Sequence, residues 1–162
     1  MVQDGTDDQV SHDSQRLARK LRLRDGLGFL ARVVSAQANQ LFEDLTRQKT
    51  ITARQYGALV TLHQHGPLTL TDLAVHISVD RSTLTDMVQR MVRDGLIRKS
   101  YNDNDRRSSI VVLTADGAAA VARLTPGAAK VQDVLMAPLA PAERRQMLRW
   151  MKLIIDANED RY

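Results

Sequence analysis

Apolar residues recur at helical spacing in the first third of the chain, and polar or small residues mark where each helix ends. Residues 25–46 carry a broad apolar stripe, which predicts an amphipathic helix. The stripe consists of Leu30, Val33, Val34, Leu41, Phe42 and Leu45. A second helix is predicted over 52–65, because Thr52 and Gln55 have capping-box spacing and a Gly-Pro pair follows at 66–67.

The next segment predicts two helices separated by a tight turn. After a short extended piece at 68–69, residues 70–76 form the first helix, 77–79 the turn and 80–94 the second helix, with Gly95 as its C-cap. The second helix has an apolar side formed by Leu84, Val88, Met91 and Val92. Its opposite side is polar and consists of Ser82, Thr85, Asp86, Gln89 and Arg93, with Arg90 at the margin.

Residues that favour β-structure follow over 96–101 and 109–113, and they predict a two-stranded hairpin. The loop between them, 102–108, is polar and carries Arg106 and Arg107 at its tip. An ordinary solvated turn has a similar composition, so the loop indicates a function only together with the predicted elements on either side of it.

The last part of the chain predicts helices again. Thr114 caps a helix that the run 125–127 (Thr-Pro-Gly) interrupts, and the sequence leaves open whether this helix continues or a second one replaces it. Pro141 suits the first turn of a final helix that reaches about residue 157. The predicted fold class is therefore mainly α with a small β wing (α+β).

Composition narrows the class of protein. The chain is 43% hydrophobic and 26% charged, as expected of a globular protein. It has no apolar run long enough for a bilayer and no secretory signal, so we expect a cytoplasmic protein. With no cysteine and no metal-ligand spacing among its four histidines, it predicts neither a metal nor a cofactor, and no enzyme.

The net charge of +4 is unevenly distributed. Residues 1–15 carry four aspartates and no basic residue, and are predicted to be a disordered acidic tail, which leaves +8 on the rest. The basic stretch 16–24 fits a solvated helix start better than an arm against phosphates. A basic body permits binding to nucleic acid without demanding it.

The order helix, helix, tight turn, helix, hairpin over residues 52–114 is the layout of a winged helix-turn-helix. Short hydrogen-bonding side chains near the start of its second helix suit base edges in a major groove. An arginine at the tip of a wing suits a narrow minor groove. The helix face by itself fits a DNA-reading surface and an ordinary solvated surface equally well.

The segment from Asp105 to Thr114 matches the D-x-R-x(5)-L-T signature of MarR-family transcriptional regulators, and the run from Asp80 to Ile97 also resembles that family. The resemblance covers about residues 25–157 and is specific over 52–117. It implies a homodimer in which 16–51 and 115–162 form dimerisation helices. It also implies double-stranded DNA with a pseudo-palindromic operator as the partner, half-sites roughly 34–36 Å apart, and a repressor released by a small aromatic or anionic ligand.

The same resemblance implies roles for individual residues. Arg107 resembles the wing-tip arginine of the minor groove, and Asp105 its structural partner. The other candidate DNA-binding residues are Arg81, Ser82, Thr83, Thr85, Gln89, Arg90 and Arg106. The role of Asp86 stays open, since it either accepts from a cytosine amino group or points away from the bases.

The effector pocket is expected between the dimerisation helices and the DNA-binding lobe. Arg32, Tyr56 and His63 are the candidate ligand-binding residues, although a solvated Arg32, a core Tyr56 and a hydrogen-bonded His63 would need no ligand. The alternative function is a winged-helix module that binds protein or RNA, because fold alone does not decide the partner.

Overall fold

The computed structural model describes residues 14–102 and 105–158 and contains two compact units, Met1–Gln37 and Ala38–Tyr162. In the first unit residues 14–20 are helical, η1 (Leu23–Asp25) is a 3-10 turn and α2 (Leu27–Thr46) begins. The described part of the stretch 16–24 is exposed along its whole length. Of the predicted acidic tail, only residues 14 and 15 are described, and they are helical. The functional division at 51/52 stays a prediction.

In the second unit, α3 (Ala53–His65) starts with the predicted capping box. The Gln55 amide donates to Thr52 Oγ1 at 3.2 Å, and the Thr52 amide donates to Gln55 Oε1 at 2.9 Å. These reciprocal bonds satisfy two amides near the helix start that lack partners within the helix. The Gln55 side chain is buried while it makes them, so the start of α3 is fixed from inside the lobe.

The helices α4 (Leu70–His76) and α5 (Arg81–Arg93) follow with the predicted bounds to within a residue. Between them Ser78 has a φ of +51°, a left-handed conformation that lets the chain reverse within three residues. After α5, Gly95 has a φ of +73°, as a glycine at a helix C-terminus commonly does. The turn therefore holds the two helices in the compact arrangement that the sequence predicts.

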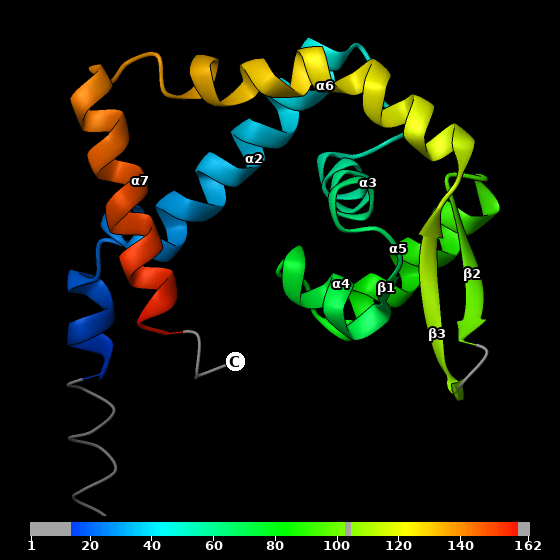
Figure 1. Ribbon diagram of the computed structural model, residues 1–162. Helices are drawn as coiled ribbons and strands as arrows, with labels where there is room; N and C mark the ends of the chain where they lie inside the picture. The colour runs from blue at the N-terminus through cyan, green and yellow to red at the C-terminus, as the bar shows by residue number, and fades with distance from the viewer. Residues whose placement is uncertain (1–13, 103–104, 159–162) are drawn as a thin grey trace, which may run out of the picture. The chain divides into compact units, whose positions relative to one another are not determined.

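A three-stranded antiparallel sheet completes the lobe, with strand order β1-β3-β2. Its strands are β1 (Leu68–Thr69), β2 (Ile97–Asn102) and β3 (Asp105–Leu113), and Figure 1 shows β2 and β3 as a hairpin that extends away from α5. The predicted loop over 102–108 is wrong for most of its length, because β3 already begins at Asp105. Backbone pairing does not require apolar side chains, so the polar residues extend the strand.

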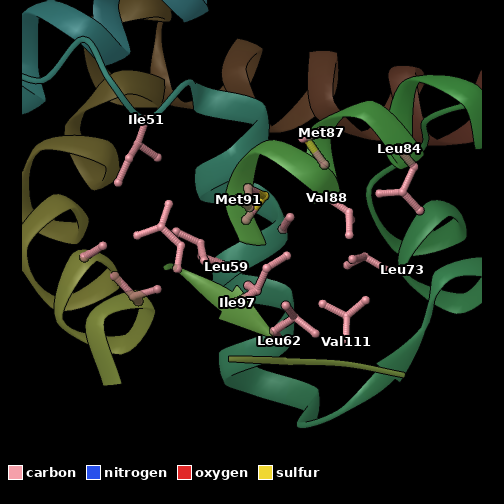
Figure 2. Packing of buried hydrophobic residues seen from close by; sticks show 14 of the residues in the cluster. Ile51, Leu59, Leu62, Leu73, Leu84, Met87, Val88, Met91, Ile97 and Val111 are labelled. Atoms are coloured by element: carbon pink, nitrogen blue, oxygen red, sulfur yellow. The ribbon is translucent and has the colours of Figure 1, made fainter. Parts of the chain in front are cut away.

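Buried side chains from α3, α4, α5, β2 and β3 form one core. Figure 2 shows side chains from α3, α4, α5 and the sheet meeting between these elements. The largest fully buried ones are Leu59, Leu62, Leu73, Leu84, Val88, Met91, Ile97, Val111 and Leu124. A continuous core of this kind makes the lobe stable enough to present an outer surface of fixed shape.

The helix α6 (Ala115–Leu135) continues through Pro126, which answers the question that the sequence left open. Proline has no backbone N–H, so α6 lacks one of its internal hydrogen bonds at Pro126. Next to this position the helix packs closely against another one. A Cβ on Gly127 would lie 2.6 Å from the Leu45 carbonyl oxygen of α2, so glycine is required where α6 crosses the end of α2. Thr125 also bonds within the helix, donating to the Val121 carbonyl at 2.7 Å.

The final helix α7 (Pro141–Asp156) has no capping side chain at Ala140, as expected. Glu143 supplies half of a cap instead, because the Ala140 amide donates to its carboxylate at 2.7 Å. None of the α7 residues is buried. Six of its large apolar residues are exposed by more than a third, namely Met147, Leu148, Trp150, Leu153, Ile154 and Ile155. The apolar side of this helix therefore lies outside the core of its own unit.

Candidate nucleic-acid interface

The buried side of α5 consists of Leu84, Met87, Val88 and Met91. This corrects the predicted apolar side in one position. Val92 is exposed, and Met87 takes its place in the core. Met87 and Val92 lie at opposite edges of the apolar arc, and the rest of the lobe covers only the edge that carries Met87.

The opposite side of α5 is solvent-exposed and polar, as predicted. Ser82 and Gln89 are exposed, and Thr85 is half-buried. Asp86, Gln89, Arg90 and Arg93 line one hollow in the surface. The Arg90 Nε donates to the Asp86 carbonyl at 3.3 Å, which holds its guanidinium along the helix. This side therefore combines hydroxyl, amide, carboxylate and guanidinium groups on one rigid element.

Asp80 caps α5 and organises its first turn. Its Oδ1 accepts from the Ser82 hydroxyl at 2.6 Å and from the Thr83 amide at 2.8 Å, and its Oδ2 accepts from the Thr83 hydroxyl at 2.6 Å. The Ser82 hydroxyl, followed by the hydroxyl and amide of Thr83, holds the pKa of the Asp80 carboxyl well below its usual range. Asp80 is therefore a carboxylate at neutral pH.

Thr83 lies on a different side of α5 from Ser82. It is half-buried and, with Met87 and Arg90, lines a cavity of about 380 Å³. The rest of the lining comes from Asn39, Glu43, Thr52, Ala53, Arg54 and Gln55, at the second half of α2 and the start of α3. A group bound in this cavity would touch the back of the helix whose front is the predicted DNA surface.

The wing residues Asp105, Arg106 and Arg107 lie in β3, not in a loop. Asp105 pairs with Asn102 of β2, where the register of the hairpin is irregular. The side chains of this segment lie outside the part of the chain that the structure describes. The hairpin backbone thus carries the three residues toward its tip, and their predicted contacts with DNA stay predictions.

The three candidate ligand residues fall in different surroundings. Tyr56 is half-buried, packs on Phe42 with ring centroids 5.3 Å apart, and has its hydroxyl 3.0 Å from Thr125 Oγ1. His63 is exposed on α3. Arg32 belongs to the first unit, where its guanidinium lies 5.4 Å from the centre of the Phe29 ring. Their shared role as a ligand site stays a prediction.

Two features of the site escaped the sequence prediction. The acceptor role of Asp80 could have been found, because an aspartate three residues before Thr83 has N-cap spacing. The cavity lined by Arg54 and Thr83 could not, because it depends on how α2, α3 and α5 pack.

A rigid helix with a polar outer face, preceded by a helix and a tight turn and followed by a β-hairpin, is the architecture of a winged helix-turn-helix, the class in which this second helix commonly enters the DNA major groove. A family model described as MarR family matches residues 51–109. The HTH-type transcriptional repressor NicR of Pseudomonas putida is 29% identical over 134 residues, which cover 83% of this chain and 85% of NicR.

Solved structures agree in fold. BpsR of Bordetella bronchiseptica, whose DNA binding is regulated by 6-hydroxynicotinic acid, has a TM-score of 0.77 at 26% identity and covers 84% of this chain and 97% of its own. A mutant of MarR from Escherichia coli complexed with operator DNA has a TM-score of 0.73 at 27% identity, with 80% and 93% covered. The chain belongs to the MarR family, and it is a DNA-binding transcriptional regulator rather than an enzyme.

No helix among the described residues combines the length and the apolar character that a membrane span requires.

Proposed function

We propose that this chain is a homodimeric, cytoplasmic repressor that binds a pseudo-palindromic operator and leaves it when a small anionic or aromatic ligand binds. The observation that carries the proposal is the polar outer face of α5, held rigid by the four buried residues on its other side. In this arrangement α5 enters the major groove, and Arg107 on the wing enters the adjacent minor groove. The resemblance to NicR, a transcriptional repressor, favours repression.

The base-reading group would consist of Ser82, Thr85 and Gln89, which share the exposed side of α5. Arg81, Arg90 and Arg106 would contact phosphates, since a guanidinium donates to two phosphate oxygens at once. Thr83 has a weaker claim to a base contact, because it is half-buried and lines the cavity behind the helix. Asp105, near the tip of the wing, would be the structural partner of Arg107.

The dimer would form through α7 and the N-terminal helices. The exposed apolar side chains of α7 support this, because a soluble monomer rarely leaves so many large apolar residues of one helix in water. Two-fold symmetry then places the two copies of α5 about one turn of DNA apart, roughly 34–36 Å.

The cavity behind α5 is the effector site that we propose. Arg54 and Arg90 in its lining can attract a carboxylate, and Met87 offers an apolar contact for a ring. The regulation of BpsR by 6-hydroxynicotinic acid, an aromatic carboxylate, favours this class of ligand. The dimer is taken to have two forms, one that fits the operator and one that does not. A ligand that binds the second form more tightly lowers operator affinity by the difference between its two binding free energies.

The test of DNA binding is a titration of the full chain with duplexes selected from a random pool, carried out over a series of salt concentrations. We expect one selected site to bind far more tightly than bulk duplex, with an affinity that falls steeply as salt rises. Equal affinity for all duplexes would contradict the proposal. Preference for single-stranded RNA or for a protein would favour the alternative winged-helix module.

The effector proposal is tested separately with pyridine and benzene carboxylates added to the preformed complex. Release by such a compound, reduced in Arg54→Ala, supports the cavity as its site. Release that is unchanged in Arg54→Ala but lost in Arg32→Ala or His63→Ala would instead favour the site predicted from the sequence.

A further inference from the structure

The hydroxyl groups near the start of α5 all donate their protons to acceptors within the protein. A hydroxyl has one proton to donate and two lone pairs with which to accept. The Ser82 hydroxyl is 2.6 Å from Asp80 Oδ1, and the Thr85 hydroxyl is 2.8 Å from the Arg81 carbonyl oxygen. Ionised carboxylates and carbonyls can only accept, so in both bonds the hydroxyl must be the donor.

The direction of these bonds decides what the outer face of α5 offers to DNA. With its proton committed to Asp80, Ser82 presents only lone pairs to a base. Thr85, whose proton goes to the Arg81 carbonyl, likewise presents only lone pairs. The carboxylate of the exposed Asp86 also offers only acceptors. The three neighbouring groups are therefore matched to hydrogen-bond donors in the major groove.

The donors in that groove are the exocyclic amino groups, N6 of adenine and N4 of cytosine, whereas guanine and thymine present acceptors there. We propose that Asp80 and the Arg81 carbonyl fix Ser82 and Thr85 as hydrogen-bond acceptors, so that α5 selects adenine or cytosine at the bases that these residues contact. This inference rests on the proposed function, in which α5 enters the major groove. Asp80 is then a positioning residue that sets specificity without touching DNA.

The proposal is tested by removing single atoms from both sides of the contact. Once the selected duplex is known, each adenine near α5 is replaced by purine and each cytosine by 2-pyrimidinone, which lack the exocyclic amino group. A second set replaces each purine by its 7-deaza analogue, which lacks the N7 acceptor. Binding of the wild type, Ser82→Ala and Thr85→Val to each duplex gives double-mutant cycles.

We expect one amino deletion to weaken wild-type binding by about two- to tenfold, as loss of a neutral hydrogen bond does. The same deletion should have no effect on the variant that lacks the contacting hydroxyl. The inference would be overturned, with specific binding still present, if either hydroxyl coupled to an N7 deletion. It would also be overturned if neither hydroxyl coupled to any amino or N7 deletion. Failure to select any duplex would instead refute the proposed function.

Two variants distinguish the role of Asp80 as acceptor for the Ser82 hydroxyl from the effect of its negative charge. Serine and asparagine cap helices about as well as aspartate. Asp80→Asn keeps one oxygen, which the Thr83 amide requires as its acceptor, and Ser82 shares that oxygen. Asp80→Ser is too short to reach both donors, so the Ser82 proton becomes free to face the DNA.

Both variants remove the same negative charge. Only Asp80→Ser should reduce the coupling between the Ser82 hydroxyl and the exocyclic amino group of the base, to a value near zero. Asp72→Asn is the control, because Asp72, in the first turn of α4, accepts at 2.7 Å from the hydroxyl of Thr69, the N-cap of that helix. Its coupling should equal that of the wild type. Equal coupling in Asp80→Ser and Asp80→Asn would overturn the positioning role of Asp80.

Discussion

The helices α5 and α7 are both amphipathic, yet only α5 finds a core within its own chain. Four apolar residues of α5 are buried among α3, α4 and the sheet. In α7 no residue is buried, and Trp150 and Ile155 are each 58% exposed. The lobe is therefore complete in one protomer, whereas the apolar side of α7 lies outside its core, and in the proposed dimer a second copy would cover it.

The largest effect should come from removing a core side chain of α5. Leu84→Ala deletes a fully buried side chain and should lower the free energy of unfolding by about 2–5 kcal/mol, because the cavity collapses only partly. Urea unfolding followed by circular dichroism measures it. A loss below about 1 kcal/mol would mean that the lobe does not depend on this core.

Placing a charge on the apolar side of α7 should break association but not the lobe. Ile154→Asp should weaken dimerisation by at least about a hundredfold, because the proposed interface loses a buried isoleucine and must also take a carboxylate out of water. Sedimentation over a range of concentrations measures this change. Arg149→Asp, on the other side of the same helix, is the control and should leave the dimer intact; dissociation of both variants would argue against a specific interface.

A smaller effect is expected at the wing. Arg107→Ala should weaken the free energy of operator binding by about 1–2 kcal/mol, roughly five- to thirtyfold, without changing dimerisation, because it removes one minor-groove contact. Fluorescence anisotropy with a labelled operator gives the affinity. Arg123→Ala, on the exposed surface of α6, should bind as the wild type does. An unchanged affinity in Arg107→Ala would remove the wing from the interface.

The smallest effect concerns the turn before α5. Ser78→Gly should raise the free energy of unfolding by up to about 1 kcal/mol, because glycine adopts a φ of +51° without the penalty of a Cβ. Thermal unfolding measures the change, and Ser78→Ala should show no gain. Stabilisation by both substitutions would mean that backbone strain at Ser78 is not the cause.

Local signals in the sequence predicted most of the lobe. Thr52 with Gln55 marks the start of α3, and Gly95 marks the end of α5, because capping depends on residues only a few positions apart. The prediction erred where packing decides. Periodicity leaves Met87 and Val92 at opposite edges of the apolar arc, and which of them enters the core depends on the edge that the rest of the lobe covers.

The wing and α6 show the same limit. Antiparallel pairing extends β3 back to Asp105, although its residues have the composition of a loop. Pro126 can either end a helix or be accommodated within one, and the outcome depends on contacts elsewhere, such as the close approach of Gly127 to Leu45. The acceptor state of Ser82 likewise depends on a distance to Asp80 that sequence spacing only suggests.

The most direct test of the central claim is the dependence of binding on the spacing between operator half-sites. If two lobes joined through α7 read DNA together, two protomers should bind each duplex. Inserting about five base pairs, half a helical turn, between the half-sites should lower affinity more than tenfold, while about ten should restore part of it. Binding of one protomer per half-site with no dependence on spacing would contradict the account.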